Sequence, residues 1–127
     1  MNRKAQRGLT LIELMVVLVI LGIIISIGYP GYTGQMRKSR RAAAVSTIQD
    51  AALAQEQFRA NNPTYGTVAE IGLAVSDDYY TYTTSNISAT TFTITATATV
   101  GGAQTADTGC TALTINESNV RGPAACF

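Results

Sequence analysis

The chain has 127 residues, of which 46 % are apolar and only 13 % charged, and its formal net charge is +1. This length suits one domain, and the charged fraction is about half of the ~25 % usual in soluble domains. The chain contains no His and only two Cys, which excludes histidine-based acid–base chemistry, His triads and the common zinc-ligand sets. We therefore expect no enzyme, no catalytic residues, no metal site and no cofactor.

The small net charge hides an asymmetry along the chain. Residues 1–41 hold seven bases and one acid, whereas residues 42–127 hold seven acids and only two bases, Arg59 and Arg121. The formal charges of the two parts are therefore +6 and −5. This pattern favours attachment of the N-terminal part to a membrane or a partner, and disfavours a body that binds nucleic acid.

The first long apolar stretch covers residues 9–29, and Glu13 is its only strongly polar member. Three bases precede it: Arg3, Lys4 and Arg7. One interpretation is a secretory signal peptide cut after Gly28, which would release an exported soluble binding module. A carboxylate at mid-membrane costs about 2.5 to 3.5 kcal/mol, an odd burden for a disposable leader. The helical pattern also continues far beyond Gly28.

The string Arg-Gly-Leu-Thr-Leu-Ile-Glu-Leu at residues 7–14 resembles the class III leader of type IV prepilins. In that family a short basic leader ends in Gly, is cut on the cytoplasmic side and leaves Glu at the fifth mature position. The resemblance implies that residues 1–8 are a leader, and that a prepilin peptidase/methyltransferase cuts after Gly8 and methylates the new terminus at Leu9. Most members begin with Phe where this chain has Leu9.

Glu13 acquires a role if this cleavage takes place. The cut creates an α-amine at Leu9, four residues before Glu13, and a buried carboxylate is tolerable only when it is paired. Helical spacing would let Glu13 pair with the amine of its own chain or of a neighbouring subunit. The resemblance implies the neighbour's amine, so that Glu13 would set the register of assembly. Alternatively, Glu13 only snorkels to the lipid head groups.

Two further positions match the helix-weakening residues of the family, Gly22 and Pro30. Proline inside a helix removes one backbone hydrogen bond and clashes with the preceding turn. We therefore expect a kink or an opened segment between Gly22 and Pro30. Residues 9–34 as a whole are predicted to be the hydrophobic transmembrane and assembly half of one helix.

Strong helix formers continue from Gln35 to Asn61. Five mostly apolar side chains recur there at steps of three and four: Val45, Ile48, Ala52, Gln55 and Phe58. They predict an amphipathic helix that covers another surface. A helix over residues 9–61 would be about 80 Å long, so its first half would project from the body into lipid or other subunits.

A cluster of bases begins this second half: Arg37, Lys38, Arg40 and Arg41. One interpretation is an exposed, solvated stretch or contact with lipid head groups. The alternative is contact with the acidic bodies of neighbouring subunits, which salt would weaken.

The remaining sequence predicts a small sheet. Val68, Ile71 and Leu73 lie in a connecting loop over residues 64–78, from which they are expected to tuck under the body. From Tyr79 the hydrophobic period becomes two, which predicts strands at 79–84, 91–100 and 111–116, with turns at 85–89 and 101–102. The predicted fold class is α+β: a long N-terminal helix packed on a C-terminal antiparallel β-meander, with residues 35–127 as the globular domain.

Cys110 and Cys126 are 16 positions apart in the C-terminal part. A disulfide between them would stabilise the body by about 3 kcal/mol and would place it in an oxidising compartment outside the cytoplasm. A metal or redox pair is the weaker alternative, because the spacing is not Cys-x-x-Cys. The tail resembles the disulfide-bounded loop that ends many type IVa pilins and minor pilins.

The resulting hypothesis is a structural subunit, a minor pilin of a type IV pilus, that serves adhesion, motility or DNA uptake. It implies a single-pass precursor in the bacterial inner membrane and an extracellular filament, with other pilins and an inner-membrane assembly platform as partners. The alternatives are a pseudopilin of a type II secretion system and the exported module described above. A DNA-uptake receptor ranks lower, because only Arg59 and Arg121 lie on the body.

Overall fold

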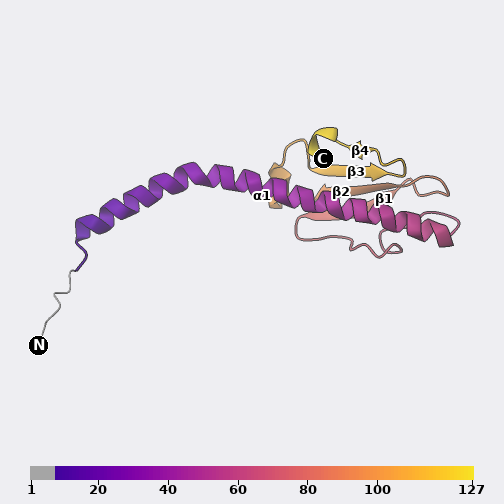
Figure 1. The fold of residues 1–127 in the computed structure, drawn as a ribbon, viewed down its shortest axis with the longest axis horizontal. Coiled ribbons are helices and arrows are strands. Elements are labelled where there is room, and N and C mark those ends of the chain that lie inside the picture. The colour runs from indigo at the N-terminus through magenta and orange to yellow at the C-terminus, as the bar shows by residue number, and fades with distance from the viewer. Residues whose placement is uncertain (1–7) are drawn as a thin grey trace, which may run out of the picture. The chain divides into compact units, whose positions relative to one another are not determined.

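The computed structural model describes residues 8–127, and its main helix spans more than a third of them (Figure 1). The elements in chain order are α1 (Leu11–Asn61), β1 (Tyr80–Ser85), β2 (Thr93–Ala98), the short 3-10 helix η1 (Ala103–Ala106), β3 (Ala112–Asn116), β4 (Arg121–Gly122) and a second 3-10 helix, η2 (Ala124–Cys126). The chain divides into two compact units after Gln35, and α1 contributes to both.

Helix α1 begins at Leu11, two residues later than predicted, because Thr10 caps it. The Glu13 backbone N–H donates to the Thr10 hydroxyl oxygen at 3.3 Å, and a Thr side chain in this place satisfies one of the unpaired N–H groups of the first turn. The helix ends at Asn61, as predicted. The Asn62 side-chain amide donates to the carbonyl oxygen of Phe58 at 2.8 Å, which satisfies one of the last helical acceptors.

Helix α1 is continuous through both predicted weak points, Gly22 and Pro30. The expected opened segment is therefore absent from this part of the structure. A single proline removes one backbone hydrogen bond, and this loss does not interrupt the 51-residue helix. The Thr33 hydroxyl donates to the carbonyl oxygen of Pro30 at 3.0 Å, so this acceptor is used.

The four strands form one antiparallel sheet in the order β1-β2-β3-β4, which confirms the predicted meander. All three predicted strands are present, each within two residues of its expected ends. The second strand was expected to continue to residue 100, and this was wrong: β2 ends at Ala98, and Val100 is 96 % exposed. Gly101 turns the chain there with a φ of +75°, a backbone conformation that residues with a side chain rarely adopt. Strand β4 has only two residues, too few to give a sequence pattern.

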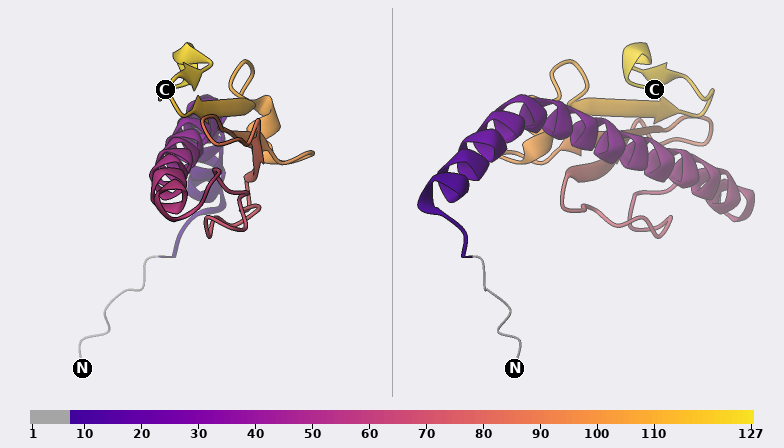
Figure 2. Two further views of the ribbon diagram at one scale, coloured as in Figure 1. Left: turned by 90° about the vertical axis from the view of Figure 1, so that its right-hand side faces the viewer. Right: turned by 60° about the vertical axis from the view of Figure 1, so that its left-hand side comes forward.

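The second half of α1 lies along one face of the sheet (Figure 2). Ile48 and Gln55 of the predicted stripe are buried, and Val45 and Ala52 pack partly buried against the core. The largest fully buried apolar side chains come from α1, the strands and Phe92: Ile48, Tyr80, Tyr82, Phe92, Ile94, Leu113 and Ile115. The loop residues predicted to tuck under the body do so, partly buried against the same core: Val68, Ile71 and Leu73.

Candidate assembly site

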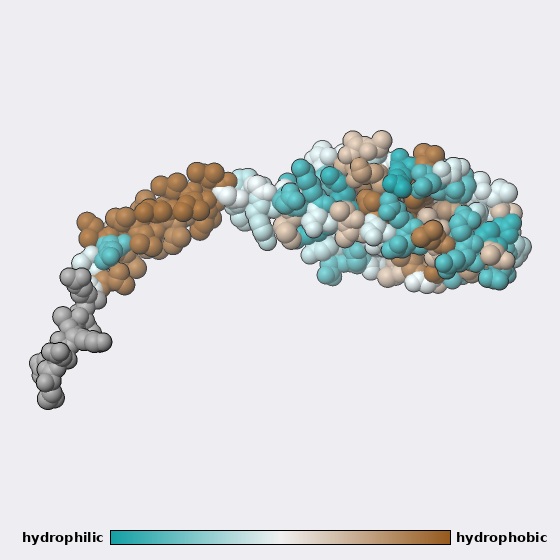
Figure 3. Space-filling view, in the orientation of Figure 1, coloured by the Kyte–Doolittle hydropathy of each residue, from teal (hydrophilic) through white to brown (hydrophobic). Residues whose placement is uncertain are grey.

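The first half of α1 exposes nearly all of its apolar side chains. Leu11 is 78 % exposed, Ile23 is 56 % exposed and Ile27 is 76 % exposed. The hydrophobic colour is almost continuous over this half, whereas the body has a mixed surface (Figure 3). By length and composition α1 is able to cross a membrane, and none of its most apolar window is buried inside the chain. This surface requires an apolar environment supplied from outside.

Glu13 lies in the first turn of α1, where the helix dipole favours a negative charge. Gly8 and Leu9 precede the helix, so the predicted cleavage point is outside regular structure, and Leu9 is 78 % exposed. The structure brings Glu13 next to Thr10, a neighbour that the sequence reasoning missed. The Thr-x-x-Glu spacing at residues 10–13 is a known signal of a helix start and was available in the sequence.

The predicted cluster of bases is divided by the structure. Arg41 pairs with Asp107, with its Nη1 at 2.8 and 2.9 Å from the two carboxylate oxygens. The expectation that Arg41 contacts lipid or a neighbour's acid is therefore wrong, because its own body supplies the partner. The Arg40 guanidinium lies over the ring of Tyr79, 4.2 Å from the centroid. Within residues 8–127, Arg37 and Lys38 form no ion pair.

The predicted disulfide between Cys110 and Cys126 is present, with a Cα–Cα distance of 5.7 Å. Both cysteines are buried. The bond ties the segment before β3 to η2. It therefore fastens the C-terminal segment to the sheet, since β4 itself contributes only two paired residues.

A groove of about 360 Å³ lies beside the second half of α1, and we call it the α1–β3 groove. Apolar and polar side chains from three segments line it: Gln49, Ala52, Leu53 and Glu56 of α1, Phe92, and Ile115, Asn116, Glu117, Asn119 and Arg121. The Tyr65 hydroxyl donates to Glu56 at 3.0 Å, and the Phe92 N–H donates to Glu117 at 3.2 Å. Burial and the Glu56 carboxylate together raise the pKa of Tyr65. The carboxylates are thus held in place.

The two bases of the body differ in availability. Arg59 donates to the carbonyl oxygens of Ala89 and Asn62, at 2.7 and 2.8 Å. Arg121 is exposed and lies 5.9 Å from the centroid of the Phe127 ring. The part of the chain that the structure describes holds no group of three or more His, Cys, Asp or Glu placed to bind a metal ion.

Two family models match the chain. The model described as "Type IV minor pilin ComP, DNA uptake sequence receptor" matches residues 30–114. The model described as "Prokaryotic N-terminal methylation motif" matches residues 3–29. The first match covers most of the body, and the second covers most of the proposed leader and most of the apolar half of α1.

Curated relatives include type II secretion system core protein G of Klebsiella michiganensis, 39 % identical over 70 residues, or 55 % of this chain and 49 % of that protein. Fimbrial protein Q of Moraxella bovis is 38 % identical over 84 residues, or 58 % of this chain and 51 % of that protein. The chain thus spans about half the length of such relatives. A solved type IV pilin from Shewanella oneidensis superposes with a TM-score of 0.57 at 25 % identity, covering 72 % of this chain and 97 % of that one.

Proposed function

Because the chain belongs to the type IV minor pilin family matched over residues 30–114, we propose that it is a structural subunit of a type IV pilus. Its work is non-covalent assembly. The subunit waits in the bacterial inner membrane, anchored by the first half of α1, and then moves into an extracellular filament through the inner-membrane assembly platform. The family is structural, and we assign no catalytic role to any residue.

The observation that carries this proposal is the exposed apolar half of α1. Residues 11–27 present large aliphatic side chains on all sides of the helix, and no other part of the described chain covers them. An all-round apolar helix belongs in a membrane or in the core of an assembly. Lipid covers it before assembly, and the corresponding helices of other pilins cover it afterwards.

Processing prepares this helix for assembly. A prepilin peptidase/methyltransferase removes residues 1–8, methylates Leu9 and leaves a charged terminus next to Thr10 and Glu13. Pairing between this amine and the Glu13 carboxylate of a neighbouring subunit removes the cost of burying either charge alone. Although α1 is continuous through Gly22 and Pro30 in this structure, the hydrogen bond lost at Pro30 makes this the segment that opens when the subunit leaves the membrane.

Mass spectrometry of the mature chain tests the proposal. A first residue at Leu9, with or without one methyl group, supports it, whereas a first residue at Tyr29 would mean that a soluble module is released. In a deletion strain, loss of extracellular filaments with intact protein secretion supports a pilin. Loss of secretion with intact filaments would assign the chain to a type II secretion pseudopilus, as its protein G relatives suggest.

DNA reception is a second candidate function, favoured by the description of the matched family as a DNA uptake sequence receptor. The body works against it, because residues 42–127 carry a formal charge of −5 and Arg59 is engaged by backbone carbonyl groups. Phosphate contacts would then depend on Arg37, Lys38 and Arg121. A gel shift of the purified protein at low salt tests this, and binding that a triple Ala variant of these bases abolishes would support it.

A further inference from the structure

We propose that the α1–β3 groove is the docking site for a second copy of this chain, and that the copy inserts the edge formed by Arg40, Tyr79 and Asp78. We call these three residues the Arg40–Tyr79 edge. This inference rests on the proposed function, since it names a contact between subunits of the filament.

The charges in the groove are incompletely balanced within the chain. Glu56, Glu117 and Arg121 line it and give a formal charge of −1. The only ion pair within residues 8–127 joins Arg41 to Asp107, so neither glutamate is neutralised by a base. A cation from outside would pair with one of these glutamates, and the exposed side chain of Leu53, which also lines the groove, would pack against the less polar part of its side chain.

The Arg40–Tyr79 edge offers such a cation. Arg40 has no acidic partner within residues 8–127, and its guanidinium lies on the half-buried ring of Tyr79. Arginine and tyrosine are among the residues that most often dominate protein interfaces. The nearby carboxylate of Asp77 is occupied, because it accepts hydrogen bonds from the Tyr82 hydroxyl and two backbone N–H groups. Asp78 is exposed and is free to face Arg121 of the copy that carries the groove.

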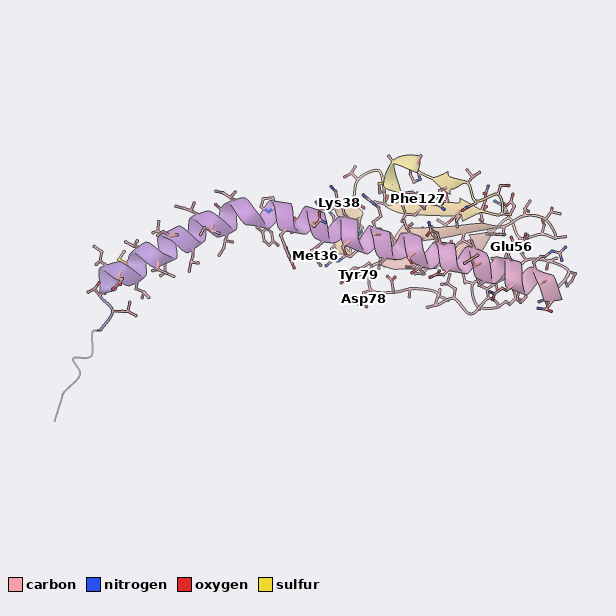
Figure 4. The ribbon with its side chains drawn as sticks, viewed as in Figure 1. Met36, Lys38, Glu56, Asp78, Tyr79 and Phe127 are labelled. Carbon is pink, nitrogen blue, oxygen red and sulfur yellow. A yellow bond between two sulfur atoms is a disulfide. The ribbon has the colours of Figure 1, made fainter. Side chains whose placement is uncertain are left out.

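The groove and the edge lie on opposite sides of α1. Arg40 and Glu56 are 16 residues apart, which places them about 160° apart around the helix. In Figure 4, Glu56 is labelled on one side of α1, and Tyr79 and Asp78 on the other. Parallel copies that stand side by side bring opposite sides together, so each copy would offer its edge to one neighbour and its groove to another. Such a contact is heterologous and propagates along a filament.

Lys38 is an exposed base near the start of the body, and the same geometry excludes it. Lys38 and Glu56 are 18 residues apart, or five turns, so they lie on the same side of α1. Figure 4 shows Lys38 on that side, with Phe127. A parallel neighbour would therefore turn its Lys38 away from the groove. This difference between Arg40 and Lys38 supplies a matched control.

The distance along α1 also fixes the stagger. Sixteen residues correspond to about 24 Å, so the copy that inserts its edge is displaced by that amount along the helix axis. Pairing of Glu13 with a neighbour's Leu9 amine requires a displacement of only about 6 Å. The two contacts therefore belong to different neighbours of one subunit.

Cross-linking between two differently tagged copies tests the proposal. One copy carries Arg40→Cys and the other Glu56→Cys, and both are expressed in the native host. We expect a linked pair in the sheared filament fraction after treatment with a short bismaleimide, because an arginine and a glutamate in contact keep their Cα atoms farther apart than the ~7 Å that a direct disulfide allows. The control replaces Arg40→Cys by Lys38→Cys at the same end of the body, and we expect roughly fivefold less product from it. Peptide masses measured after proteolysis verify that the Cys110–Cys126 disulfide is retained in each copy.

Equal or greater linking in the Lys38 control, with both copies recovered in filaments, would overturn the inference and leave the proposed function standing. Failure of both copies to enter any filament would count against the proposed function itself. A charge exchange adds a second measurement. Glu56→Arg is expected to reduce incorporation, and a partner copy with Arg40→Glu is expected to restore it. Failure of that restoration would mean that a protein other than a second copy occupies the groove.

Discussion

The two halves of α1 use similar residues in opposite ways. Before Gln35 the aliphatic side chains are exposed to whatever surrounds the chain, as with Leu18 at 60 % and Ile24 at 61 %. After it, Ile48 is fully buried against the sheet, and the core is completed by aromatic side chains such as Tyr80 and Phe92. One continuous helix therefore carries a surface made for other molecules and a surface made for its own body.

This difference predicts how each region responds to change. The body contains its own core, a disulfide and buried hydrogen bonds, so substitutions there should alter the free energy of unfolding. The first half of α1 packs on nothing within the described chain. Substitutions there should leave the folded body unchanged and alter assembly instead. The predictions below test this division, beginning with the largest expected effect.

Glu13→Ala is expected to leave cleavage after Gly8 intact and to lower incorporation into filaments by about tenfold or more, because a neighbour's amine then loses its buried counter-charge. The mature mass measures processing, and immunoblots of sheared filaments measure incorporation. Glu13→Gln is the matched control for size, and it should show the same defect because it also lacks the charge. Normal incorporation of either variant would show that Glu13 does no more than reach the head groups.

Removing the disulfide tests the body in the same way. Replacement of both Cys110 and Cys126 by Ser is expected to lower the free energy of unfolding by about 3 kcal/mol, because the unfolded chain regains the freedom of the loop. Urea unfolding of the detergent-solubilised protein, followed by tyrosine fluorescence, measures it. A variant with unchanged stability would mean that the C-terminal segment is held by its other contacts, such as Arg121 on the Phe127 ring.

Strong periodic patterns in the sequence predicted most of the body. The alternation of apolar and polar residues before Val100 predicted β2. The recurrence of mostly apolar side chains at steps of three and four predicted the buried side of α1, including Gln55. These patterns succeed because burial on one face imposes the same spacing in every sheet or helix. The Cys pair was also predictable, because the chain offers no other partner for either sulfur atom.

The remaining features depend on contacts between distant residues, and local pattern does not encode them. Arg41 was assigned to solvent, lipid or a neighbour, but Asp107 approaches it from 66 positions away. The α1–β3 groove likewise combines Glu56 with Glu117, which only the completed meander brings together. Strand β4 is recognised only by its pairing with β3. The role of Thr10 as a helix cap is indicated by the Thr-x-x-Glu spacing and not by hydrophobic periodicity.

Gln55 is a buried polar residue in the second half of α1. Its side-chain amide donates to the carbonyl oxygen of Gly66 at 2.6 Å, and its oxygen accepts from the Gly66 N–H at 2.8 Å. Gln55→Leu would leave both buried backbone groups without partners, so we expect a loss of about 2 kcal/mol. Urea unfolding measures it against Gln57→Leu, an exposed change two residues away that should cost much less. Equal effects of the two variants would contradict the role given to Gln55.

The smallest effect is expected at Asp77, and it depends on pH. Burial raises the pKa of this carboxyl, but hydrogen bonds from the Tyr82 hydroxyl and the N–H groups of Tyr79 and Tyr80 outweigh it, so the pKa falls below its usual value. A carboxyl with a lowered folded pKa adds stability above its unfolded pKa and loses that contribution as the pH falls through the folded value.

Asp77→Asn should therefore lower the free energy of unfolding near neutral pH, and solvent screening of this exposed side chain limits the loss to about 1 kcal/mol or less. The difference between variant and parent should shrink as the pH falls from neutral through the lowered pKa of Asp77. Urea unfolding at neutral and at acidic pH measures this difference in the free energy of unfolding, with Asp78→Asn as the neighbouring control that lacks these hydrogen bonds. A loss that is equal at both pH values would assign the role of Asp77 to the shape of its side chain rather than to its charge. Asp77→Asn should leave incorporation into filaments unaffected, because the carboxylate of Asp77 is engaged within its own body.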